Sequence, residues 1–187
     1  MTKYNKPSLI WTEGWIEKIV VGLGLCPFAA IPFKKNQIRL VSFSGDDLVS
    51  LLELLKAECN FLLVSDPEKT ETTLIVIEDT LNTFEEYLNF VTIAESLMDQ
   101  LHLEGILQLA TFHPNYRFGD SAGENDPSDY TNRSPYPMLH LLREESVSTA
   151  VDSYPDIDEV PQRNILRMQQ LGTVKIQQML EDIKKSI

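Results

Sequence analysis

The residue types best suited to chemistry are concentrated in one stretch of the chain, residues 111–143. It holds His113 and His140, two of the three histidines in the sequence. Imidazole changes its charge near neutral pH, so a histidine beside other polar groups can act as a general acid or base. His113 directly follows an apolar run typical of a strand. We therefore predict His113 and His140 as catalytic residues, with a backbone-bonded strand-end histidine as the alternative for His113.

Arginines in the same stretch suit a small anionic ligand. The planar guanidinium group binds phosphate or carboxylate through paired hydrogen bonds. The predicted ligand-binding residues are Arg117, Asn132, Arg133, Ser134, Tyr136 and Arg143. Four acids lie among them, namely Asp120, Glu124, Asp126 and Asp129. These acids could instead pair with the arginines and only fix the loop, so that alternative stays open.

Metal binding is another use of these side chains. His113, His140 and Asp126 would offer imidazole and carboxylate ligands, which suit zinc, iron or manganese. The stretch contains no HExxH pattern, and its acids do not follow the spacing of a calcium-binding loop. The sequence therefore leaves both the metal and the cofactor unknown.

Cys26 is the third candidate for chemistry. Paired with a histidine, its thiol would become a nucleophile. A cysteine in this kind of context is more often a small buried apolar residue. Cys59 fits the apolar stripe of a predicted helix, so we expect it in the core.

Apolar spacing predicts the elements that must position these residues. The expected helices with clear bounds are 7–23, 84–101, 160–171 and 174–185. The helix at 84–101 begins with a Thr83/Glu86 capping box. Two further helices are expected, one capped by Ser44 and one that starts at Pro137. The expected strands are 38–43, 73–77 and 106–112. Residues 113–137 are too long for an ordinary connection, so we predict an ordered functional loop.

Strands that alternate with long helices predict an α/β or α+β domain spanning residues 1–187. We expect a small parallel or mixed sheet of three or four strands, packed with helices and followed by a helical tail. If the first three strands are parallel, their ends bring Ser42, Ser44, Glu78, Asp79 and His113 to one edge, where open sheets bind ligands. A ferredoxin-like mixed sheet would scatter these groups.

Charge and hydropathy narrow the function classes. The net charge of −12, without a basic stripe, disfavours nucleic-acid binding. The sequence has no apolar run long enough for a membrane span and no secretion signal, so we expect a cytoplasmic protein. The sequence does not indicate an oligomeric state.

The first hypothesis for the function is an enzyme acting on a small anionic metabolite by hydrolysis or group transfer. The alternatives are a non-catalytic binding or interaction module and a cysteine-dependent enzyme.

Three motifs carry a resemblance to a known family. They are GLGLCPFA (Gly22–Ala29), FHPNYRF (Phe112–Phe118) and NRSPYPMLHLLRE (Asn132–Glu144). With these motifs the chain resembles the bacterial family called domain of unknown function 1415. The resemblance implies a compact cytoplasmic bacterial protein and supplies no reaction.

Overall fold

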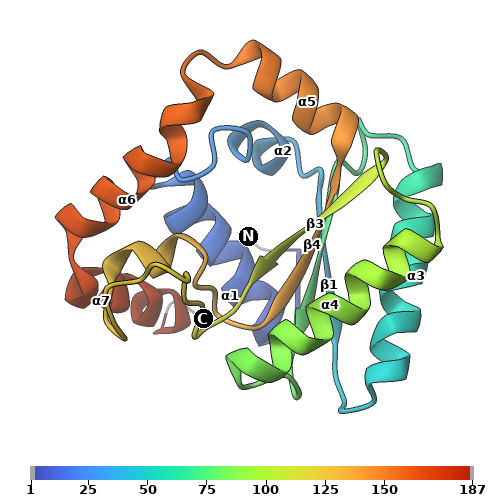
Figure 1. The fold of residues 1–187 in the computed structure, drawn as a ribbon, viewed down its shortest axis with the longest axis horizontal. Helices are drawn as coiled ribbons and strands as arrows, with labels where there is room; N and C mark the ends of the chain where they lie inside the picture. The colour runs from blue at the N-terminus through green and yellow to red at the C-terminus, as the bar shows by residue number, and fades with distance from the viewer. Residues whose placement is uncertain (1–2, 186–187) are drawn as a thin grey trace.

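The fold is a mixed four-stranded sheet with helices on both sides (Figure 1). The computed structural model describes residues 3–185. The strands are β1 (Ile38–Phe43), β2 (Thr72–Ile77), β3 (Leu107–Phe112) and β4 (Met138–Arg143), in the order β1-β2-β4-β3. β1 and β2 are parallel, whereas β4 is antiparallel to both of its neighbours. The mixed-sheet prediction is confirmed.

The described residues form seven α-helices and three other helical segments. The α-helices are α1 (Pro7–Trp15), α2 (Ala30–Lys34), α3 (Leu48–Val64), α4 (Phe84–Gln100), α5 (Glu144–Ser153), α6 (Val160–Leu171) and α7 (Thr173–Lys185). The other segments are the π-helix η1 (Ile16–Val21) and the 3-10 turns η2 (Pro127–Thr131) and η3 (Ile157–Glu159). The helical tail is confirmed. No helix in the described part of the chain is long and apolar enough to cross a membrane.

Side-chain caps mark the first turns of α3 and α4. Thr83 and Glu86 form the predicted capping box of α4. The predicted Ser44 cap was wrong. Asp47 caps α3 by accepting hydrogen bonds from the amides of the first turn. Ser8 lies inside α1, and its hydroxyl donates to Glu78.

The helix predicted to start at Pro137 was wrong, because Met138–Arg143 is strand β4. This segment fills the gap between β2 and β3 and completes the hydrogen bonds of both. Its alternate side chains point to opposite sides of the sheet, so Leu139 and Leu141 are fully buried on one side. His140 and Arg143 consequently do not share a helix face. The helix that follows, α5, begins only at Glu144.

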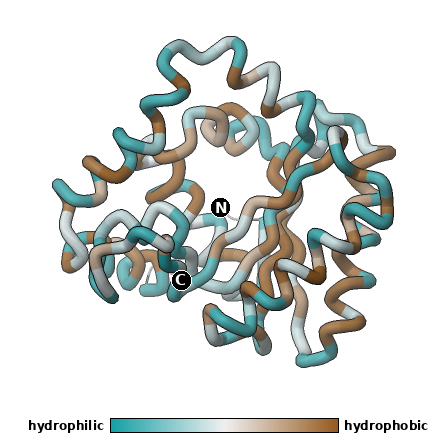
Figure 2. Tube along the Cα trace, viewed as in Figure 1, coloured by the Kyte–Doolittle hydropathy of each residue, from teal (hydrophilic) through white to brown (hydrophobic). Residues whose placement is uncertain are grey.

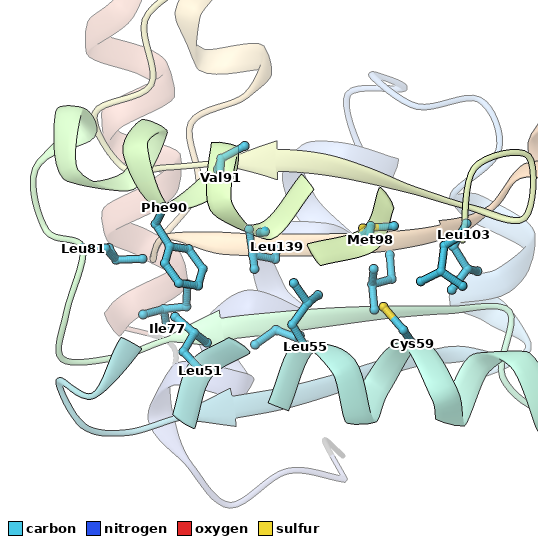
Figure 3. Close-up of a cluster of buried hydrophobic side chains, with 14 of the residues drawn as sticks. Leu51, Leu55, Cys59, Ile77, Leu81, Phe90, Val91, Met98, Leu103 and Leu139 are labelled. Carbon is cyan, nitrogen blue, oxygen red and sulfur yellow. The ribbon is translucent and has the colours of Figure 1, made fainter. Parts of the chain in front are cut away.

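Each side of the sheet carries its own apolar core. α3 and α4 cover one side, where Leu51, Leu55, Ile77 and Leu139 meet (Figure 3). Cys59 belongs to this core, as predicted. On the other side α1 packs on β1 and β2, and α7 packs against α1. The strands form the apolar centre of the trace in Figure 2.

Candidate functional site

The sheet is incompletely covered on the α1 side. Strand alternation turns six side chains of β3 and β4 to this side, and five of them are partly exposed: Gln108, Ala110, Phe112, His140 and Leu142. The buried residues Leu74 and Met138 lie on the same side nearer α1. We call the five residues the half-covered face. In Figure 1, α5 leaves the end of β4 and runs away from this face towards α6.

His140 lies at the centre of the half-covered face, and Thr72 holds its ring. The Thr72 hydroxyl contacts both His140 Nε2, at 2.7 Å, and the Leu141 carbonyl oxygen. A hydroxyl has one hydrogen and a carbonyl only accepts, so Thr72 donates to Leu141. It must then accept from Nε2–H of His140. Nδ1 therefore carries the lone pair, and it has no hydrogen-bond partner among residues 3–185.

Burial keeps this imidazole neutral. Desolvation lowers the pKa of His140 from 6.5 to about 4. At pH 7 the side chain thus offers an uncharged acceptor with a fixed tautomer. Such a group can accept a hydrogen bond from a ligand or take up a proton from one.

His113 has a different environment. It is completely buried beneath the aromatic rings of Phe84 and Tyr87. Its Nε2 donates to the Leu81 carbonyl at 3.1 Å, and its Nδ1 accepts from the Asn115 amide at 3.0 Å. Both nitrogens are therefore occupied, which agrees with the backbone-bonded alternative. Burial also lowers the pKa of His113.

The loop after β3 is ordered around a buried ion pair. Asp129 is fully buried and accepts hydrogen bonds from the Phe118 amide and the Ser121 hydroxyl. Arg133 donates to Asp129 at 3.3 Å, and also to the carbonyls of Tyr116 and Glu124. The guanidinium group further lies over the Tyr130 ring. Most of its donors are thus used to hold the loop.

Arg143 lies at the opposite end of β4 from Arg133. Its Nη2 donates to the Ser65 carbonyl and hydroxyl and to the Thr70 carbonyl, so it ties the end of α3 to the sheet. A six-residue strand spans roughly 20 Å. The structure therefore does not bring Arg133 and Arg143 to one small ligand. Arg117 is exposed, and its binding to an anion stays a prediction.

The other predicted ligand-binding residues mainly have local partners. The Asn132 amide donates to the Thr111 carbonyl at the edge of β3, and the Ser134 hydroxyl donates to the Tyr136 carbonyl. The Tyr136 ring stacks on Trp11. Asp126 caps η2 by accepting from the Ser128 amide. In the described part of the chain no three His, Cys, Asp or Glu side chains are arranged to hold a metal ion, so Asp126, His113 and His140 do not converge.

Cys26 lies in the loop that follows η1. Its sulfur accepts from the amides of Phe28 and Ala29, but desolvation is the larger effect and raises the pKa of the thiol. Residues of α6 hold this loop, because Asn164 donates to the Leu25 carbonyl and Arg167 to the Leu23 carbonyl. No hydrogen bond joins Cys26 to a histidine among residues 3–185.

The predicted convergence at the strand ends is partly confirmed. β1, β2 and β3 point the same way, so Ser44 and Glu78 meet at one edge. Glu78 also accepts from Ser8 and pairs with Lys6 at 3.3 Å. These hydrogen bonds lower the pKa of Glu78 against the opposing effect of burial. The group is mutually satisfied and joins α1 to the sheet.

A small hollow lies elsewhere, beside the outer edge of β1. Its lining includes Glu13, Phe33, Ile38 and Leu40. It contains no histidine or cysteine among the residues that the structure describes. We locate the candidate site at the half-covered face instead, because His140 Nδ1 is an oriented acceptor there that has no hydrogen-bond partner among residues 3–185.

Thr72 and Gln108 are the two polar residues of the site that the sequence did not indicate. Thr72 begins a buried strand and Gln108 interrupts an apolar one, a pattern common in ordinary strands. Only the pairing of β4 with both β2 and β3 relates them to His140.

Comparison with known proteins gave one match. Residues 10–178 match the model of a family described as Protein of unknown function (DUF1415). No curated protein and no solved structure matches the chain.

Proposed function

Because the chain belongs to the DUF1415 family, whose description names no activity, we propose a function from the geometry: it binds a small molecule at the half-covered face. His140 Nδ1 accepts a hydrogen bond from an O–H or N–H group of that molecule. The unpartnered Nδ1 on an imidazole that Thr72 orients carries the proposal.

The surrounding side chains support a ligand at this position. Phe112 lies beside His140, with 6.1 Å between the ring centroids. Ala110 pairs with His140 across the strands, and its small side chain is partly exposed. An oriented polar group within a mainly apolar surround is typical of small-molecule sites.

Catalysis by His140 as a general base is the second candidate function. The contact chain from Leu141 through Thr72 to His140 favours it, because catalytic histidines are commonly oriented by a third group. Hydrolysis or group transfer would use Nδ1 to take a proton from water or a hydroxyl. An imidazole with a pKa of about 4 is a weak base, so ligand binding ranks first.

The experiment is a ligand-observed NMR screen of a small-molecule library against the native chain and two variants. His140→Phe keeps a ring of similar size but removes both nitrogens, and Thr72 can still donate to Leu141. His102→Asn is the matched control, since His102 is exposed and asparagine tolerates its left-handed backbone.

We expect compounds with O–H or N–H donors to bind the native chain and His102→Asn, but to lose binding in His140→Phe. Thermal melting checks that each variant is folded. If every compound that binds the native chain also binds His140→Phe equally well, the proposed site is refuted.

A further inference from the structure

We infer the ligand class, an inference that rests on the proposed site at His140. The ligand is an uncharged planar ring that carries an N–H donor next to a carbonyl, that is, a cyclic amide. Gln108 is its second polar contact. This assignment follows from the partners left open on the half-covered face and from the absence of charge there.

Gln108 supplies a free amide near His140. Its side chain makes no hydrogen bond with any residue that the structure describes, and it is partly exposed. It lies two residues before Ala110, the residue paired with His140. Two residues along a strand span about 7 Å, which matches the width of one ring with its polar substituents.

The two polar groups complement a cyclic amide. His140 Nδ1 only accepts, so it requires a donor such as a ring N–H. The Gln108 amide can donate to a carbonyl that lies beside that N–H. A ring N–H and the carbonyl beside it can therefore satisfy both side chains at once.

The side chains between them favour a flat ring. Ala110 presents only a methyl group at the centre of the face. Phe112 lies two residues further along β3 from Ala110, and Leu142 lies on the neighbouring strand β4. An aromatic ring beside a small residue gives a planar ligand a stacking surface without a steric barrier.

The strands offer no counter-charge to an anionic ligand on the half-covered face. On the α1 side, none of the described strand residues is charged: they are Ile38, Leu40, Ser42, Thr72, Leu74, Val76, Met138 and the half-covered face. Arg143 points to the other side, where it holds Ser65. A carboxylate placed on this face would lose solvation without gaining a counter-charge from the sheet.

The experiment measures dissociation constants by NMR titration of the isotope-labelled native chain with three probes. 2-Pyridone is the neutral cyclic amide, N-methyl-2-pyridone lacks its donor, and benzoate is an anion of similar size. Gln108→Leu removes the amide at nearly constant volume. Gln170→Leu is the control, on the exposed surface of α6.

We expect 2-pyridone to bind and to shift the His140 signals, and N-methylation to weaken binding at least tenfold. Gln108→Leu weakens 2-pyridone about tenfold, the effect of one hydrogen bond, and Gln170→Leu leaves it unchanged. Equal binding of both pyridones, stronger binding of benzoate, or no binding of 2-pyridone overturns the ligand class. The site itself is judged separately, by the loss of any library binder in His140→Phe.

Discussion

Protonation of His140 makes the stability of the folded chain depend on pH. The pKa of this histidine is about 4 in the folded state and 6.5 in a solvated chain. Below pH 6.5 the histidine of the unfolded chain becomes protonated, whereas His140 of the folded chain becomes protonated only near pH 4. The free energy of unfolding therefore keeps its full value above pH 6.5 and decreases as the pH falls towards 4.

The magnitude is about 2 kcal/mol between pH 7 and pH 5. At pH 5 the unfolded histidine is almost fully protonated, while the folded one is only about one-tenth protonated, and each pKa unit corresponds to about 1.4 kcal/mol. His140 is partly exposed, so this value is an upper limit. His113, whose pKa is also lowered, adds a loss of the same sign.

Urea unfolding at pH 7 and pH 5 measures the effect in the native chain, His140→Gln and His102→Asn. The pH-dependent loss should be smaller by up to about 2 kcal/mol in His140→Gln and unchanged in His102→Asn. Carboxylates such as Glu78 also lose stabilising hydrogen bonds when they are protonated at low pH. Their contribution is the same in all three chains, so it cancels when the chains are compared. An identical loss in the native chain and His140→Gln would refute a neutral, desolvated His140.

Three further predictions concern Thr72 at the site, Gly22 after η1 and the buried Asp129. Thr72→Val leaves Nε2–H of His140 without its acceptor, so we expect the free energy of unfolding in urea to fall by about 1–3 kcal/mol. Nitrogen NMR of this variant should show a mixture of His140 tautomers. An unchanged tautomer would contradict the hydrogen-bond assignment. Gly22→Ala places a Cβ 2.4 Å from the Lys18 carbonyl oxygen and should cost about 1–3 kcal/mol, whereas Gly119→Ala, with open space around it, should cost under about 0.5 kcal/mol. Asp129→Asn weakens the ion pair with Arg133 and should speed tryptic cleavage after the exposed Arg117 several-fold, while the exposed Asp120→Asn leaves that rate unchanged.

Local signals in the sequence predicted the elements whose ends have strong caps or turns. The Thr83/Glu86 capping box and the β-branched run of β2 are examples, because each depends on neighbours within a few residues. β4 escaped prediction because Met138–Arg143 is equally compatible with one helical stripe and with a strand. Only its hydrogen bonds to two strands far away in sequence decide between them.

The site shows the same division between local and distant information. His113 and His140 were both candidates, and neither type nor spacing separated them. The difference comes from distant residues: Phe84 and Tyr87 bury His113, whereas His140 stays partly exposed. The clustering of polar types in 113–137 reflected how Asp129 and Arg133 order that loop.

The strand order has a consequence for how the chain folds during its synthesis. β4 is the last strand in sequence, yet it occupies a central position between β2 and β3. Until Met138–Arg143 has left the ribosome, β2 and β3 both expose unpaired backbone groups along an open edge. Fragments that end before β4 should therefore be prone to aggregate, and closure of the sheet is a late event in folding.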